Sequence, residues 1–420
     1  MRPWGEKVKK SIGIQAVALA LTAGCAQIIV ALLYIISARS TEPENFGLVV
    51  TAIAVGTTAV GFLDFGTNSL WVREIASSRL DPRTLGRKIA SKLLYAFAAL
   101  GVSTTLTAMF FGPTNIWMAG PVAMCLLVSQ SIQVPLRGHG RGDLVALANL
   151  IDKLTAACIF ALLLALNVVP SMALWVCLAA GALSSALFAW KITPRENRGR
   201  LSLRRLVNPW AGSRHYGVAN VAITAQSLDI PAMTIFGGPG AAGIYAAVSR
   251  WTQPMGLLAS AFSSASAPHV ARASSLREAW IVARRSSWLL VTAMALSLAV
   301  AAFAPVVVDL LIGPDYAGSA DVLRIMALTT IVGIANQPLF VFLQSRGFDK
   351  PVAVITVAGI IIQLGLVVIL SNQFSAVGAA VAFACSQLFL FISMSIVLTG
   401  ARSRGKRGVK TVTERLAKTQ

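Results

Sequence analysis

The 420-residue chain is 56% hydrophobic and only 12% charged, with a mean hydropathy of +0.72, which excludes a soluble globular protein and predicts an integral membrane protein. A net charge of +20 would indicate nucleic-acid binding in a soluble protein. Here the basic residues lie in loops between apolar runs, so no nucleic-acid partner is expected.

Apolar runs separated by charge clusters and by Gly, Pro and Asn turns predict twelve membrane-spanning helices, because one span takes about 20 residues. In the first half the predicted helices cover residues 12–37, 46–71, 89–111, 115–136, 144–167 and 170–190. In the second half they cover residues 214–236, 240–266, 286–311, 318–343, 351–370 and 374–399. The first apolar run is too long for a secretory signal and is read as a membrane helix.

The 36 Lys and Arg residues alternate between the two sides of this arrangement. Nearly all of them lie in the N-terminal segment and in the loops after even-numbered helices, whereas the opposite loops hold Arg39 alone. The positive-inside rule therefore predicts that both termini are cytoplasmic. The five cysteines lie in apolar runs without a CxxC pair, and the three histidines lie at cytoplasmic loop ends. No metal site, catalytic constellation or histidine relay is predicted.

A basic segment divides the helices into two sets of six. The predicted domains are an N-terminal lobe of residues 1–190, a cytoplasmic linker of residues 191–213, a C-terminal lobe of residues 214–399 and a basic tail of residues 400–420. The halves resemble each other at an offset of 196 residues, at which Gly47 matches Gly243. Six helices per half insert in the same direction, so the sequence predicts a parallel repeat. The predicted fold is an all-α membrane protein of two six-helix lobes around a central cavity.

Charged residues deep in the predicted spans are the first candidates for function, because charges at this depth are costly. Arg250 and Asp229 flank the turn at residues 237–240 and lie roughly 17 Å and 14 Å into their helices, at 1.5 Å per residue. They could form a structural ion pair or line a site open to the interior. Pro231 and Pro254 each remove a helical hydrogen bond beside these charges, so both are predicted hinges.

Other charges are less deeply placed. Asp152 and Lys153 lie roughly 13 Å into their helix. As sequence neighbours they are expected to point in different directions, so that they cannot simply neutralise each other. Asp64 ends the helix at 46–71 and is either a functional entry point or an ordinary helix end. Lys92, one turn from Lys88, is expected to snorkel to the cytoplasmic surface.

Both halves of the chain contain short motifs that together resemble those of a known family. In the first half they are Ala38-Arg39, Phe46-Gly47, Asp64-Phe65-Gly66 and Arg73-Glu74-Ile75. In the second half they are Asp229, Gly243-Ile244-Tyr245-Ala246-Ala247, Arg250, Pro268, Gly313-Pro314-Asp315-Tyr316 and Gln344-Ser345-Arg346-Gly347. These motifs resemble the Wzx-type lipid-linked oligosaccharide flippases among the bacterial polysaccharide transporters of the MOP superfamily. The resemblance spans nearly the whole chain, without helices 13 and 14 of the members that flip the peptidoglycan precursor.

The resemblance implies a non-enzymatic flippase in the bacterial inner membrane that moves isoprenyl-diphosphate-linked oligosaccharide outward for O-antigen or exopolysaccharide synthesis. It implies Arg250 as a cavity cation, with Arg39, Asp64, Arg73 and Asp229 as matched motif positions. A buried arginine suits a diphosphate because its guanidinium binds phosphate oxygens in a fork. The expected partners are the lipid-linked substrate, membrane lipids, a glycan polymerase and the chain-length machinery.

The resemblance implies no cofactor, and a proton gradient, a sodium gradient and the membrane potential all stay open as energy sources. A multidrug or cation antiporter of the same superfamily is the first alternative and would call for an excess of cavity acids. A membrane glycan polymerase or ligase is a further alternative, disfavoured by the very short outer loops. A purely structural scaffold is the last.

Overall fold

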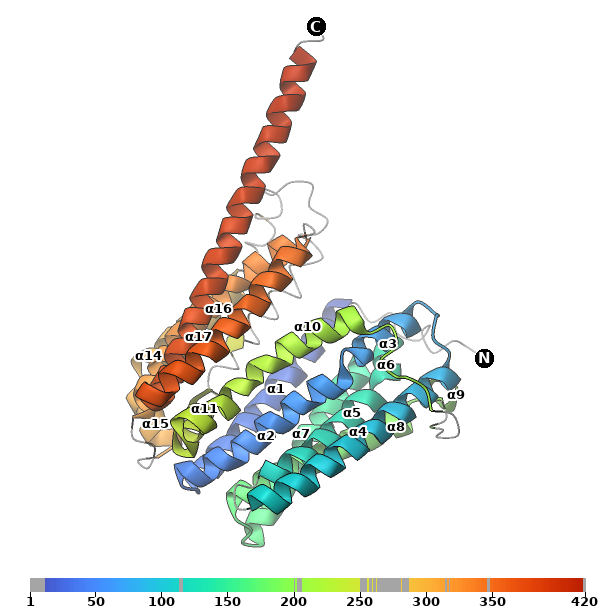
Figure 1. Cartoon of the computed structure of the whole chain (residues 1–420), viewed down its shortest axis with the longest axis vertical. Coiled ribbons are helices and arrows are strands. Elements are labelled where there is room, and N and C mark those ends of the chain that lie inside the picture. Colours follow the sequence, from blue (N-terminus) through green and yellow to red (C-terminus); the bar gives the residue numbers. More distant parts are fainter. Residues whose placement is uncertain are drawn as a thin grey trace.

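The structure is a computed structural model. It describes residues 12–112, 116–199, 201, 206–249, 287–313, 316, 318–345 and 348–417, with the isolated positions 255–256, 259, 262 and 281. Within this described part the chain is helical and contains no strand (Figure 1). The predicted all-α class is therefore confirmed.

The N-terminal lobe consists of helices that run back and forth between two ends of the molecule. They are α1 (Ile12–Arg39), α2 (Pro43–Asp64), α3 (Thr67–Ala76), α4 (Pro82–Phe111), the 3-10 turn η2 (Ile116–Met118), α5 (Ala119–Ile132), α6 (Val134–Gly138), α7 (Gly142–Ala165), α8 (Pro170–Ile192) and the short α9 (Arg195–Arg198). Both α1 and α5 pack against α8, and α1 also packs against α7.

The C-terminal lobe repeats this pattern with more breaks. Its helices are α10 (Arg214–Ala225), the 3-10 turn η3 (Gln226–Leu228), α11 (Asp229–Gly237), α14 (Trp288–Ala302), α15 (Ala304–Leu311), α16 (Ser319–Ser345) and α17 (Asp349–Ala417). Residues 239–249 are also helical. The apolar stretch Lys350–Gly400 has 51 residues, enough for two crossings. Its backbone breaks at Ser375 (φ 50°, ψ −132°), next to the predicted turn.

By length and composition, seven described helices can span a membrane, or up to eight when the bent pair α14–α15 counts as one span. The sequence predicts twelve. The difference arises where predicted spans are broken into shorter helices, where two are merged in α17, and where residues 250–286 lie largely outside the described part.

Two of the predicted helices that are broken in the structure show where the chain departs from the prediction. The helix predicted for residues 46–71 breaks at Phe65 and Gly66, whose φ angles of 43° and 69° end α2 and begin α3. The helix predicted for residues 286–311 bends by 74° between α14 and α15. Pro305 explains this second break, because its ring nitrogen cannot donate a hydrogen bond to the carbonyl of Ala301.

The two lobes meet closely at one end of the molecule, which we call the turn end because it carries Arg39, Pro43 and Gly237. A β-carbon on Gly47 would lie 1.8 Å from the carbonyl oxygen of Pro239, and one on Gly243 would lie 2.1 Å from that of Pro43. The repeat offset relates Pro43 to Pro239 as it relates Gly47 to Gly243. The two helices therefore cross through a reciprocal contact that glycine alone permits.

The opposite end carries Asp64, Ile192 and Arg214, and we call it the linker end. Helices α10 and α11 run beside α2, whereas α16 and α17 diverge from the N-terminal lobe toward the linker end (Figure 1). The two lobes are thus in close contact at the turn end. Helices α10 and α11 of the C-terminal lobe pack against α2 of the N-terminal lobe.

Candidate functional site

A buried ion pair lies inside the N-terminal lobe. The ammonium of Lys92 on α4 lies 2.9 Å from Asp64 Oδ1, and it also donates to Thr67 Oγ1 at 3.1 Å and Asn68 Oδ1 at 2.8 Å. Lys92 is fully buried and lies over the Trp71 ring, 4.5 Å from its centroid. Three oxygens and an aromatic face thus compensate one desolvated cation.

This burial corrects the sequence-based expectation that Lys92 snorkels to the surface. Helix α4 begins at Pro82 and not at residue 89, because the Asp81 carboxylate caps it by accepting from the backbone N–H of Thr84 at 3.0 Å. The added turns place Lys92 ten residues inside the helix, roughly 15 Å from its start. Asp64 is correspondingly half of an ion pair and more than an ordinary helix end.

The break between α2 and α3 makes this pairing possible. Asp64 closes α2, and its Oδ1 accepts from Thr67 Oγ1 at 2.9 Å and from the backbone N–H of Asn68 at 3.3 Å, at the start of α3. A carboxylate at a helix N-terminus is favoured by the helix dipole. A β-carbon on Gly66 would lie 2.3 Å from the backbone of Tyr216, so α10 packs directly on the break.

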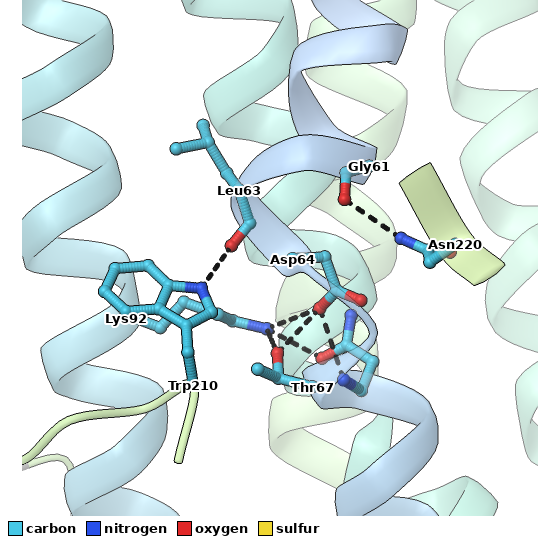
Figure 2. A network of polar contacts seen from close by, with 8 residues as sticks. Gly61, Leu63, Asp64, Thr67, Lys92, Trp210 and Asn220 are labelled. Atoms are coloured by element: carbon cyan, nitrogen blue, oxygen red, sulfur yellow. Dashed lines mark hydrogen bonds and ion pairs between the residues drawn. The ribbon is translucent and has the colours of Figure 1, made fainter. Parts of the chain in front are cut away.

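The linker and α10 also contact this region (Figure 2). Trp210 Nε1 donates to the Leu63 carbonyl at 2.9 Å, and Asn220 Nδ2 donates to the Gly61 carbonyl at 3.0 Å. The Leu63 carbonyl lies in the last turn of α2, where helical partners are missing, whereas the Gly61 carbonyl also accepts from the backbone N–H of Phe65 at 3.0 Å. These two hydrogen bonds therefore anchor the linker and α10 to the C-terminal end of α2.

The motif arginines Arg39 and Arg73 each donate a hydrogen bond across the lobe boundary, at opposite ends of the molecule. Arg39 Nη1 donates to the Leu310 carbonyl at 3.1 Å at the turn end. Arg73 Nη1 donates to Tyr216 Oη at 2.8 Å at the linker end, and this bond raises the pKa of the Arg73 guanidinium. Both side chains are exposed.

Asp152 and Lys153 lie together on α7, and here the expectation that sequence neighbours cannot neutralise each other is wrong. Lys153 Nζ lies 3.0 Å from Asp152 Oδ2, because a lysine side chain is long enough to reach the carboxylate of its neighbour. The other carboxylate oxygen, Asp152 Oδ1, is buried without a hydrogen-bond partner in the described part of the chain. It faces Gly181 of α8, whose missing β-carbon makes room for it.

Asp229 opens α11 and accepts hydrogen bonds from two neighbouring helical segments. Tyr245 Oη donates to its Oδ2 at 3.0 Å, and Gln363 Nε2 donates to the same oxygen at 3.4 Å. Its predicted partner Arg250 lies outside the described residues, so the proposed ion pair stays a prediction. Pro254 also lies outside them. Pro231 follows the 3-10 turn η3, where its lost hydrogen bond frees the Ser227 carbonyl.

Carboxamide side chains form a second polar cluster that a search limited to charged residues misses. Gln226 Nε2 donates to Gln363 Oε1 at 3.3 Å, and Asn336 Nδ2 donates to Gln387 Oε1 at 3.2 Å. All four side chains line one pocket of about 180 Å³ in the C-terminal lobe. Gln337 also lines this pocket, and these five Asn and Gln residues within otherwise apolar spans would have been the signal in the sequence.

A metal centre finds no support in the described residues, where no group of three or more His, Cys, Asp or Glu side chains comes together. His139 lies at the linker end, with Nδ1 2.8 Å from the Pro135 carbonyl.

Comparison with known proteins identifies the family. The sequence profile of the family described as "Polysaccharide biosynthesis protein" matches residues 14–274. The chain belongs to this family. The match covers the ion-paired N-terminal lobe, the linker, and Asp229 in the C-terminal lobe. No curated protein is similar enough in sequence to match the chain.

Solved structures extend the likeness to nearly the whole chain. The lipid II flippase MurJ in an inward closed conformation matches with a TM-score of 0.72 at 10% identity, over 91% of this chain and 87% of that one. An inward-facing multidrug resistance MATE transporter of the MOP superfamily matches with a TM-score of 0.64 at 15% identity, over 93% and 99%.

A MOP superfamily transporter from Pyrococcus furiosus, whose binding pocket is described as having reverse polarity, matches with a TM-score of 0.57 at 16% identity, over 93% and 95%. These likenesses show the fold. The chain therefore has the two-lobed, multi-pass membrane fold of the MOP transporters, as predicted.

Proposed function

We propose that this protein moves isoprenyl-diphosphate-linked oligosaccharide from the cytoplasmic to the outer leaflet of the bacterial inner membrane, without covalent chemistry. The observation that carries the proposal is the reciprocal contact of Gly47 with Pro239 and of Gly243 with Pro43. It closes the turn end between two related lobes that diverge toward the linker end (Figure 1). A carrier alternates between two such closures, and membership of a polysaccharide biosynthesis family supports a glycan as cargo.

The cargo's diphosphate needs a compensating cation at the depth where it leaves water. Arg250 is the proposed cation, from its sequence depth and its match to the family motif. Asp229, Asp152 and Lys153 are the other proposed pathway residues, with Arg39 and Arg73 at the lobe contacts and Asp64 in the buried ion pair. Pro231 and Pro254 are the proposed hinges. An arginine in this place binds two phosphate oxygens at once, whereas lysine provides only a point charge.

The test compares Arg250→Ala, Arg250→Lys and the control Arg324→Ala in cells that depend on the protein for surface glycan. Arg324 lies exposed on α16 and bonds within its own helix to Asp321. We expect Arg250→Ala to abolish surface glycan at normal protein abundance, with substrate accumulating on the cytoplasmic face. Arg250→Lys should keep part of the activity. Undiminished export by Arg250→Ala would reject Arg250 as the cation that compensates the diphosphate. Lys153 would then be the next candidate for that role.

A multidrug or cation antiporter is the competing function, because a similar structure carries the description of a multidrug transporter. Export of cationic dyes from cells that express the protein distinguishes the two. Dye export that Arg250→Ala leaves intact, in cells with unchanged surface glycan, would favour the antiporter.

A further inference from the structure

The carboxamide pocket in the C-terminal lobe is built from four helical segments. Gln226 comes from η3, Asn336 and Gln337 from α16, Gln363 from the first crossing of α17, and Gln387 from the second. Its volume of about 180 Å³ far exceeds the 10–15 Å³ or so that a single water needs. The pocket is thus large enough for a ligand of several heavy atoms and too large for one bare cation.

Its chemistry is neutral and offers both donors and acceptors. A carboxamide carries two N–H donors and one carbonyl acceptor, and the pocket lining, among the described residues, contains no charged side chain. Phe340 adds an aromatic ring beside the amides. Neutral donors and acceptors next to an apolar face suit a ligand with hydroxyl groups on its edges and C–H groups on its faces.

The amides are held in fixed orientations by their surroundings. A carboxylate only accepts hydrogen bonds, so Asp229 fixes the Gln363 amide with its nitrogen toward Asp229 and its oxygen toward Gln226. Asn336 is 1% exposed, and while its nitrogen bonds Gln387, its Oδ1 has no hydrogen-bond partner in the described part of the chain. A buried acceptor without a hydrogen bond lowers the stability of the folded protein by about 1–3 kcal/mol, unless a ligand or water donates to it.

The pocket also adjoins the lobe boundary. The 3-10 turn η3, which contributes Gln226 to the pocket, packs against α2 of the N-terminal lobe on one side and against α17 on the other. A ligand bound in the pocket would lie in the C-terminal lobe, next to the contact between η3 and α2.

We infer that this pocket binds one sugar ring of the transported glycan through neutral hydrogen bonds, as a saccharide subsite separate from the cation that binds the diphosphate. The inference rests on the proposed function for the identity of its ligand. Asn336 and Gln387 contact the hydroxyl groups, Phe340 covers a ring face, and Asp229 positions Gln363.

The first experiment measures binding of methyl glycosides of glucose, galactose, mannose and N-acetylglucosamine to the full-length protein in detergent, by saturation-transfer NMR. We expect a signal for at least one glycoside, at least tenfold weaker in Asn336→Leu and in Gln387→Leu. Gly333→Ala is a milder test, because its β-carbon would lie 3.4 Å from Gln387 Oε1 and fill space without a clash. It should weaken binding several-fold. Gln344→Leu, on the exposed surface of α16, is the matched control and should bind normally.

The second experiment reconstitutes these proteins in vesicles and compares transport of isoprenyl diphosphate carrying N-acetylglucosamine, or whichever of these sugars binds most strongly, with transport of the same lipid without sugar. The unsubstituted protein should prefer the sugar-bearing lipid about tenfold, and Gly333→Ala should lose most of this preference. An unchanged preference in Gly333→Ala and Asn336→Leu would overturn the subsite while leaving the flippase function intact. Failure to transport either lipid, with glycoside binding retained, would instead overturn the proposed function. Sodium-dependent stabilisation in place of any glycoside signal would assign the pocket to a cation.

Discussion

The ammonium of Lys92 lies 2.9 Å from the carboxylate of Asp64 although 28 residues separate them in the chain. Both groups are buried, and the pair joins α4 to the break between α2 and α3. The pair therefore links three helices, because moving α4 away from the break would leave a buried charge without a partner.

Removing one member of this pair should destabilise the protein strongly. We expect Lys92→Met to lower the free energy of unfolding by about 3–5 kcal/mol, because it leaves Asp64 buried and uncompensated. The double variant Asp64→Asn/Lys92→Met should lose less than the sum of the single changes. Thermal melting in detergent measures both effects. Lys88→Met is the control, since its contact with Glu74 is 3.7 Å long and should be worth under about 1 kcal/mol. Strictly additive losses would contradict the pairing.

The glycine crossing at the turn end should not tolerate a single methyl group. In Gly47→Ala the new β-carbon would meet the Pro239 carbonyl oxygen at 1.8 Å, so the lobes must separate locally, at a cost of about 1–3 kcal/mol or more. We expect the variant to transport poorly and to expose turn-end positions to labelling reagents. Gly101→Ala, where nothing lies within 4 Å of the new carbon, should be neutral or slightly stabilising. Normal activity in Gly47→Ala would argue against a functional closure at this crossing.

The threonines Thr51 and Thr234 offer a way to lock this closure. Their hydroxyl oxygens are hydrogen-bonded across the lobe boundary, so cysteines at both positions can approach disulfide geometry. In a cysteine-free background, Thr51→Cys/Thr234→Cys should cross-link on oxidation, stop transport and recover on reduction. Each single variant should transport normally under oxidant. Full transport by the cross-linked protein would show that the turn end does not open in the cycle.

Membrane orientation can be tested with one position at each end. Gly112→Cys at the turn end has open space around its side chain, and Glu196→Cys on α9 is exposed at the linker end. If the distribution of basic residues sets the orientation, a membrane-impermeant maleimide applied outside the inner membrane should label only Gly112→Cys. Labelling of Glu196→Cys from that side would invert the proposed topology.

Much of this fold could be predicted from the sequence, because apolar runs of sufficient length and loops of alternating charge follow directly from the bilayer. The breaks were harder to predict. Phe65 in a left-handed conformation depends on tertiary contacts with α10, which no local pattern reveals. Pro305 was a visible signal for the bend between α14 and α15.

The candidate site was predicted less completely, because depth estimates assumed straight helices with known starts. Lys92 was misplaced by the error in the start of α4, although Asp81-Pro82 is a recognisable cap and first helical residue. The Asp152–Lys153 pair shows that a long side chain can reach a neighbour that helix geometry alone points elsewhere. The carboxamide pocket needs four helical segments to meet, so its location follows only from the three-dimensional structure.

The reciprocal crossing of Pro43–Gly47 with Pro239–Gly243 has the geometry of an isologous interface, in which the same patch on two copies meets itself about a two-fold axis. The two halves share one steric constraint at this crossing, since a side chain added to either glycine would meet the proline carbonyl of the other half. Away from the crossing the halves differ: the N-terminal lobe holds the buried ion pair, and the C-terminal lobe holds the carboxamide pocket.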